Sequence, residues 1–232
     1  MRRPLIGACV AAAVLAGGGQ ALAHDQGPAP APDMAQRRWL AGDHHVHSRF
    51  SARYEPAPDP ASPPTAVLGG DGRYPIATNA QMALKHGLAW MVSTDHGGPN
   101  HSRINRDQAY PELQRSRLEV PGLIQFYGME FDTPGGDHSS LIMPHSHDER
   151  ELLFGIESQF SKRDAHPADP ARDTEPRMLD ALRHMQALAA PPVVIANHPS
   201  RSAKGVAAWG LYSPREFRDW NDTAPKVAIG ME

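Results

Sequence analysis

The sequence predicts an α/β fold in which strands alternate with helices around a parallel sheet. Three observations support this fold class. Short apolar runs alternate along the chain with segments of helical periodicity, the order expected of strand–helix–strand units. Pro and Gly residues separate the two kinds of segment. Histidine and acidic residues lie at the ends of the apolar runs, and sites in such folds form at the carboxyl ends of strands.

The individual elements follow from these patterns. We expect strands at 89–93, 123–127, 139–143, 193–196 and 227–229, with a shorter strand before His45. We expect helices at 78–86, 175–188 and 213–220. The last of these begins with Ser-Pro-Arg-Glu, a capping box with proline at the first helical position. The Pro-, Ala- and Gly-rich segment 54–74 predicts a long loop at the rim of a site.

Composition limits the class of protein. The 232 residues carry a net charge of -3 and are 40% hydrophobic, which fits one globular domain with a core. This charge is too near neutral for a nucleic-acid binder that acts through bulk electrostatics, so no nucleic-acid partner is expected. The only cysteine is Cys9, so metal binding elsewhere in the chain must use nitrogen and oxygen ligands.

The N-terminus has the pattern of a secretory signal peptide. Arg2 and Arg3 precede an apolar run at 5–15, and Ala21-Leu22-Ala23 is a cleavage pattern. We expect residues 1–23 to be removed, residues 24–38 to form a flexible leader and residues 39–232 to form the folded domain. The chain would then be periplasmic or secreted, with no stable membrane anchor after cleavage.

Five short segments rich in histidine and acids lie at the ends of apolar runs. They are Asp43-His44-His45-Val46-His47, Thr94-Asp95-His96, Gly128-Met129-Glu130-Phe131-Asp132, Gly136-Asp137-His138 and Asn197-His198-Pro199. Imidazole and carboxylate are ligands for divalent transition metals. Any single segment is explained as well by an ordinary capped turn or a half-buried histidine, but their recurrence at corresponding places predicts a polynuclear metal site.

The strand period assigns roles within the first segment. Residues two apart on a strand face the same side, so His45 and His47 can bind one ion, whereas His44 faces away. Glu130 lies at a strand end, where its carboxylate could bridge two ions. Asp95 could bind a metal directly or orient a ligand.

These motifs resemble the PHP family, named for polymerase and histidinol phosphatase domains. The resemblance rests on D-x-H-x-H, T-D-H, a strand that ends in Glu, a further His and H-P, and it covers residue 39 to the C-terminus. It implies a distorted (β/α)7 barrel that hydrolyses phosphoesters with two or three metal ions. By position, the family's ligands correspond to His45, His47, His96, Glu130, His138 and His198, and Asp95 corresponds to an acid beside the site.

Two departures from the family pattern change these expectations. Many members carry a further His soon after the H-x-H pair, where this chain has Arg49 and Arg53, so two metals are expected rather than three. Members also carry a late Asp-x-His, and this chain reaches Glu232 without one. We therefore expect a barrel truncated at its C-terminus.

The expected mechanism is hydrolysis of a small-molecule phosphoester by a hydroxide that bridges two divalent ions, which could be Zn, Mn or Fe. We expect His45 and His47 to hold one ion with His96 nearby, His138 and His198 to hold the second, and Glu130 to bridge them. Arg201 is the best candidate for binding phosphate, with Arg49 next, although either could be a solvated surface residue.

Two alternatives from other classes remain open. A metal-dependent amidohydrolase also uses H-x-H on a barrel strand, but that class often uses a bridging Lys, and no Lys lies at a strand end here. A non-catalytic periplasmic metal-binding protein would gather its histidines in a short tract, whereas these are spread over more than half of the chain.

Overall fold

The structure is a computed structural model that describes residues 38–232, except residues 60, 202 and 205–209. The predicted signal peptide, and the predicted leader up to residue 37, lie outside the described residues. Residues Trp39–Glu232 form one compact unit. Among the described residues, no helix combines the length and the apolar character needed to cross a lipid bilayer.

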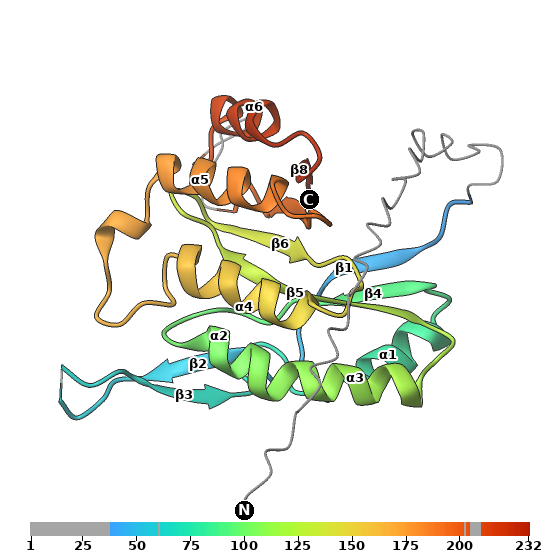
Figure 1. The fold of residues 1–232 in the computed structure, drawn as a ribbon. Coiled ribbons are helices and arrows are strands. Elements are labelled where there is room, and N and C mark those ends of the chain that lie inside the picture. Colours follow the sequence, from blue (N-terminus) through green and yellow to red (C-terminus); the bar gives the residue numbers. More distant parts are fainter. Residues whose placement is uncertain (1–37, 60, 202, 205–209) are drawn as a thin grey trace, which may run out of the picture. The chain divides into compact units, whose positions relative to one another are not determined.

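This unit is a mixed α/β fold built on a curled six-stranded sheet (Figure 1). The strands in chain order are β1 (Gly42–Val46), β2 (Ala52–Glu55), β3 (Thr65–Leu68), β4 (Trp90–Ser93), β5 (Ile124–Asp132), β6 (His138–Ile142), β7 (Val193–Asn197) and β8 (Ala228–Met231). The main sheet has the order β1-β4-β5-β6-β7-β8, and β2 pairs with β3 in a separate two-stranded sheet. The curl brings β1 towards β6, where His44 Nδ1 lies 3.0 Å from Ser140 Oγ.

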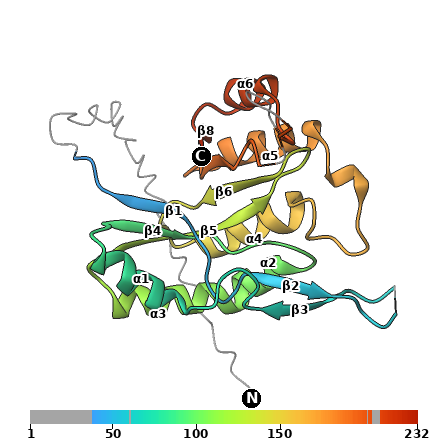
Figure 2. The same cartoon turned by 180° about the vertical axis from the view of Figure 1, so that it is seen from behind.

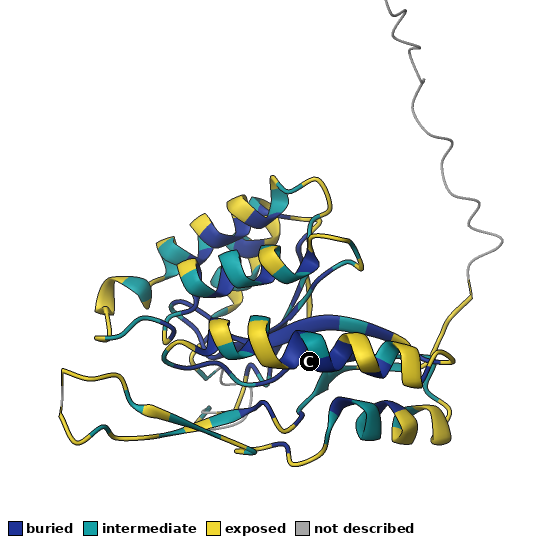
Figure 3. Ribbon diagram, turned by 60° about the horizontal axis from the view of Figure 1, so that its bottom comes forward, coloured by how far each residue is buried: buried dark blue, intermediate teal, exposed yellow. Residues whose placement is uncertain are grey.

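The helices pack in succession against the sheet and one another. They are α1 (Ile76–Lys85), α2 (His101–Ile104), the π-helical η2 (Asn105–Ala109), α3 (Tyr110–Glu119), α4 (Glu149–Phe160), the 3-10 helix η3 (Pro170–Arg172), α5 (Glu175–Gln186) and α6 (Pro214–Thr223). α1 packs against α3, α4 against α5, and α5 against α6 (Figure 2). Each longer helix turns buried residues inward and exposes the opposite side (Figure 3).

The predicted strands and helices occur near their expected positions, and the expectation of a parallel sheet is wrong for one strand. β6 runs antiparallel to both β5 and β7, whereas the β1–β4, β4–β5 and β7–β8 pairs are parallel. Between β5 and β6 the chain has only the turn 133–137, which is too short for the helical crossover that parallel neighbours need. The result places His138, the first residue of β6, opposite Asp132, the last residue of β5.

The segment 54–74, predicted as a loop, contains a hairpin instead. β2 and β3 pair from Ala52↔Leu68 to Glu55↔Thr65. Figures 1 and 2 both show this hairpin projecting beside α2. Helices α3 and α4 were not predicted from the sequence, because charged residues lie among their apolar ones.

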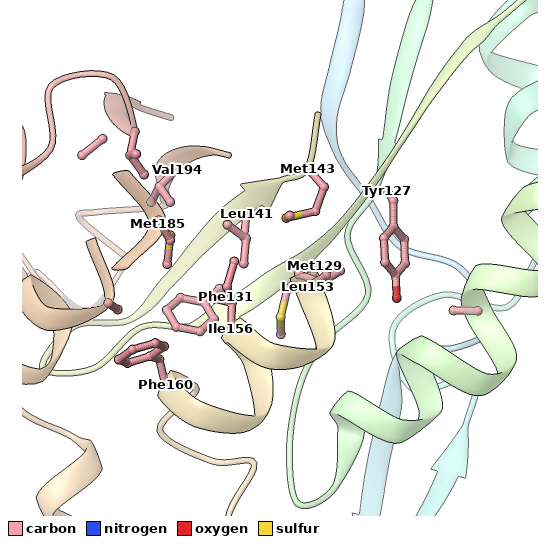
Figure 4. Close-up of a cluster of buried hydrophobic side chains, with 14 of the residues drawn as sticks. Tyr127, Met129, Phe131, Leu141, Met143, Leu153, Ile156, Phe160, Met185 and Val194 are labelled. Atoms are coloured by element: carbon pink, nitrogen blue, oxygen red, sulfur yellow. The ribbon is translucent and has the colours of Figure 1, made fainter. Parts of the chain in front are cut away.

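Strand alternation separates an apolar face of the sheet from a polar one. Tyr127, Met129 and Phe131 of β5 are buried in the core, where Met129 and Phe131 lie with Leu153 and Ile156 of α4 (Figure 4). Burying a side chain of this size contributes about 1.5–3 kcal/mol. Because successive strand residues face opposite sides, the alternate residues Glu130 and Asp132 are directed away from this core. The core therefore fixes the strand that carries the central carboxylate of the site.

Candidate metal centre

The H-x-H pair lies at the carboxyl end of β1. His45 is on the strand and His47 follows it, and their Nε2 atoms are 3.1 Å apart. His44 has its side chain on the other side, against Ser140 of β6. The strand period thus directs the two imidazoles to one point, as expected from the sequence.

Five imidazoles surround the buried carboxylate of Glu130. They belong to His45, His47, His96, His138 and His198, and together with Glu130 they are called here the Glu130 cluster. Glu130 Oε1 lies 2.9 Å from His198 Nε2 and 3.3 Å from both His45 Nε2 and His138 Nδ1. Glu130 Oε2 lies 2.9 Å from His96 Nδ1 and 3.4 Å from His47 Nε2. Each oxygen therefore faces its own set of imidazoles.

Three overlapping groups of these side chains are compact enough to hold a metal ion. They are His45, His47 and Glu130; His96, Glu130 and His138; and Asp137, His138 and His198. Within each group the candidate ligand atoms lie within 4.8 Å of one another. Glu130 belongs to the first two groups and His138 to the last two. The arrangement can therefore hold more than one divalent ion, with imidazole and carboxylate ligands.

The hydrogen bonds of His96 show that the cluster fits a cation. His96 Nε2 lies 2.6 Å from Asp71 Oδ2, so this nitrogen carries the proton and Nδ1 is an acceptor. That acceptor lies 2.9 Å from Glu130 Oε2, yet both buried atoms lack a hydrogen-bond partner. Two acceptors facing each other without a proton are costly when buried. A divalent ion between them would satisfy both.

Ser51 fixes the tautomer of His47, as Asp71 does for His96. Its hydroxyl donates to Asp95 Oδ1 at 3.0 Å and accepts from the backbone N–H of His96 at 3.1 Å. His47 Nδ1 lies 2.9 Å from the same oxygen, so Nδ1 is the donor and Nε2 is left unprotonated towards Glu130. Fixing the tautomer of a metal-ligating histidine through its other nitrogen is the usual function of such outer partners.

Electrostatics keeps the central carboxylate ionised. Burial acts to raise the pKa of Glu130, but the neighbouring imidazoles of His138, His45 and His96 hold it well below its usual range. Burial lowers the pKa of His47, which favours the neutral imidazole that a metal needs. For His138, burial acts to lower the pKa, but the Asp132 and Glu130 carboxylates raise it to about 9.

The last two groups of ligands have charged neighbours. Asp132 is fully buried and lies 3.3 Å from His138 Nε2 and 2.6 Å from Arg163 Nη2. Asp137 accepts a hydrogen bond from Arg201 Nη2 at 2.6 Å. These pairs balance the carboxylates that lie behind the imidazoles.

The structure brings together all six residues expected as metal ligands. Asp95, expected as an acid beside the site, is buried and accepts hydrogen bonds from Ser48 N, Ser48 Oγ and Ser51 Oγ. It therefore reaches the cluster through Ser51. Arg201 lies at the cluster, whereas the guanidinium of Arg49 pairs with Glu112.

Three further carboxylates were not predicted as part of the site. Asp137 stands next to His138 in the sequence, and this adjacency could have identified it. Asp71 lies 25 positions before His96 in the sequence (96 − 71), after the hairpin, and no spacing motif marks it. Glu232 Oε1 lies 3.5 Å from His45 Nδ1, and its Oε2 accepts from His198 N at 3.0 Å.

Comparisons with known proteins add no identification. Neither a scan against protein-family models nor a search of curated proteins finds a match to this chain.

Proposed function

We propose that this chain is a metal-dependent phosphoesterase that acts on a small-molecule phosphate ester with two divalent ions held by the Glu130 cluster. The observation that carries the proposal is that the buried Glu130 belongs to two compact groups of candidate ligands, one with His45 and His47 and the other with His96 and His138. This is the environment expected of a carboxylate that bridges two ions. When bound, such a pair lowers the pKa of water and neutralises charge that develops on a phosphoryl group.

The residues of the chain have distinct roles in this proposal. With two ions bound, Glu130 would be shared between them, His45 and His47 would hold one, and His138 would hold the other. His96 and His198 complete the set. Asp95 is a positioning residue, because its contact with the cluster runs through Ser51.

Arg201 supplies the cation that a phosphate ester requires. Its side chain is half exposed, and one of its five N–H groups is bonded to Asp137. The N–H groups that contact none of Asp137, His138 and His198 are available for phosphoryl oxygens, which suit the planar guanidinium.

The resemblance to PHP domains supports the same reading. Under it, the six-stranded curled sheet belongs to a distorted (β/α)7 barrel, and the ligand set suits Zn, Mn or Fe. The N-terminal pattern of residues 1–23 supports a periplasmic or secreted location.

The test combines metal content with turnover. Chain purified without chelator is analysed for bound metals and then assayed with p-nitrophenyl phosphate and with p-nitroacetanilide. We expect two ions per chain and hydrolysis of the phosphate ester only. The Glu130→Gln variant, purified in the same way, controls for contaminating phosphatases. Anilide hydrolysis that depends on Glu130 would favour an amidohydrolase, and bound metal without turnover of either substrate would favour a metal-binding protein.

A further inference from the structure

An open cleft lined by three arginines lies at the β2–β3 hairpin. Arg49 precedes the hairpin, Arg53 lies on β2 and Arg73 follows β3. The lining is completed by Val67, Leu68 and Gly69, so it contains no acidic residue. The cleft has a volume of about 500 Å³, which is in the range of pockets for small molecules. None of its arginines belongs to the Glu130 cluster.

The guanidinium groups of this cleft, called here the arginine cleft, outnumber the carboxylates that pair with them. Arg49 pairs with Glu112, and Arg53 Nη1 lies 2.8 Å from Glu55 Oε1 in a pair that is more than half exposed. In the described part of the chain, the exposed Arg73 side chain has no ion pair and no hydrogen bond. The cleft therefore keeps a positive charge without a partner, and its planar donor groups suit a carboxylate or a phosphate.

The arginine cleft lies close to the metal centre along the chain. Arg49 comes two positions after His47, and Arg73 comes two positions after Asp71, whose carboxylate lies 2.6 Å from His96 Nε2. Two residues of chain span at most about 7 Å, so the backbone of each arginine lies within that distance of a residue at the centre. A small molecule can bridge a separation of this size.

Backbone hydrogen bonds hold the two segments that carry these residues side by side. Gly69 N donates to Arg49 O at 2.8 Å, Arg49 N donates to Tyr74 O at 2.9 Å, and Gly70 N donates to Ser51 O at 2.7 Å. Gly72 packs so closely on the backbone of Ser48 that no Cβ atom would fit there. The same paired segments therefore position ligands of the metal centre and the arginines of the cleft.

We propose that the arginine cleft binds a second anionic group of the substrate, so that the enzyme selects phosphate esters that carry a further carboxylate or phosphate. The inference rests on the proposed function and names its substrate class. Arg73 and Arg53 contact the second anion, while Arg49 stays paired with the buried Glu112 and adds its charge. Binding of this remote, non-reacting group would help to hold the ester at the metal centre.

The experiment compares matched substrates on the full chain with its metal bound. A short series of alkyl phosphates ends, at the carbon farthest from the ester, in a carboxylate, in a second phosphate or in a neutral carboxamide. Phosphate release gives kcat/KM for each substrate. At the alkyl length that spans the two sites, we expect the wild type to prefer both anionic ends over the carboxamide by about 10-fold or more, because charge-assisted hydrogen bonds are strong.

Variants assign this preference to the cleft. The double variant Arg53→Ala with Arg73→Ala should remove most of the preference, and Arg73→Lys, which keeps the charge, should retain part of it. Arg183→Ala removes a similarly exposed arginine that pairs with Asp180 on α5, and it should keep the wild-type preference. Because the substrates are compared on the same variant, a general loss of stability or of metal cancels in the ratio.

Three outcomes would overturn the inference. Hydrolysis of p-nitrophenyl phosphate without any preference for an anionic end would refute the substrate class and leave the proposed function intact. A preference that survives in the double variant would place the second anion at another site. No turnover of any of these esters would refute the proposed function, and this inference with it.

Discussion

The imidazole Nε2 atoms of His45 and His47 face each other at 3.1 Å, and both are directed at the carboxylate of Glu130. Because Ser51 Oγ accepts a hydrogen bond from the N–H at His47 Nδ1, the facing Nε2 of His47 is an acceptor. A strand and a single hydroxyl thus direct the two nitrogens of one candidate ion site.

Replacing either member of this pair should remove one ion. We expect His45→Ala and His47→Ala each to lower the bound metal from two ions to one, because each leaves only one imidazole of the pair for the ion that the two would share. Elemental analysis of the purified variants measures this. His44→Ala is the matched control, since His44 is adjacent in sequence but bonds to Ser140. Two tightly held ions in His45→Ala would count against the assignment.

Glu130→Gln should have a larger effect than either histidine variant. An amide is neutral and has a single acceptor oxygen, so it cannot bridge two cations. We expect both ions to be lost while the fold is retained, measured by elemental analysis and circular dichroism. Glu112→Gln, which neutralises another buried carboxylate that bonds to Arg49 and to Ile76 N, should keep both ions. A Glu130→Gln chain that still holds two ions would exclude a bridging role.

Asp71→Asn should weaken metal binding without abolishing it. The Asp71 carboxylate holds the proton on His96 Nε2, so that Nδ1 is free to face the cluster. Loss of such an outer partner typically lowers metal affinity about 10- to 100-fold. Competition with a chromophoric chelator measures the change. Asp59→Asn, in the exposed hairpin connection, serves as the control and should bind metal with the affinity of the wild type. Equal metal affinities in the two variants would argue that Asp71 has no part in positioning His96.

Asp95→Asn should act mainly on stability. Its carboxylate accepts three hydrogen bonds, from Ser48 N, Ser48 Oγ and Ser51 Oγ, whereas an amide offers a single acceptor oxygen. Hydrogen bonds to a charged group contribute about 1.5–3 kcal/mol each, so a loss of about 2–4 kcal/mol in unfolding free energy is expected. Urea denaturation in the presence of a chelator measures it. Wild-type stability combined with lost turnover would point instead to a direct catalytic role.

The sequence could predict the parts of this site that depend on local order. The H-x-H pair, His96, Glu130 and His198 each lie at the carboxyl end of a strand, and strand period and strand ends are readable from neighbouring residues. His138 was predicted although its strand was expected to be parallel. The turn 133–137 reverses the chain, so the amino end of β6 lies beside the carboxyl end of β5. His138, the first residue of β6, therefore lies at the same edge of the sheet as the other ligands.

Contacts made by distant segments could not be predicted. Asp71, which contacts His96, follows the β2–β3 hairpin, and that hairpin lies in a segment whose Pro and Gly content indicated a loop. The contact between Arg201 and Asp137 depends on the left-handed turn at His198, which no local pattern specifies. Local sequence motifs identify the candidate ligands, whereas contacts between distant segments determine which charged residues lie beside those ligands.

The buried pair of His101 and Glu157 should make stability fall as the pH rises. His101 Nδ1 lies 2.7 Å from Glu157 Oε1, and Nε2 lies 3.3 Å from Phe50 O, so both ring nitrogens face acceptors and require protons. Burial acts to lower the pKa of His101, but Glu157 raises it from 6.5 to about 9. Burial also raises the pKa of Glu157 despite the facing imidazolium. This shift likewise makes stability fall as the pH rises, but at lower pH than the shift of His101 does.

A group whose pKa is raised by folding stabilises the folded state below its unfolded pKa, and this contribution is lost as the pH passes the folded pKa. For His101 the window is therefore pH 6.5 to about 9, and the expected loss is on the order of 3 kcal/mol in unfolding free energy. Urea denaturation in a chelator, at intervals across this window, measures it. The double variant His101→Gln with Glu157→Gln lacks both titrating groups. The difference in unfolding free energy between this variant and the wild type should therefore change steadily with pH. A difference that stays constant from pH 6.5 to 9 would mean that the pair does not carry the proton that its geometry requires.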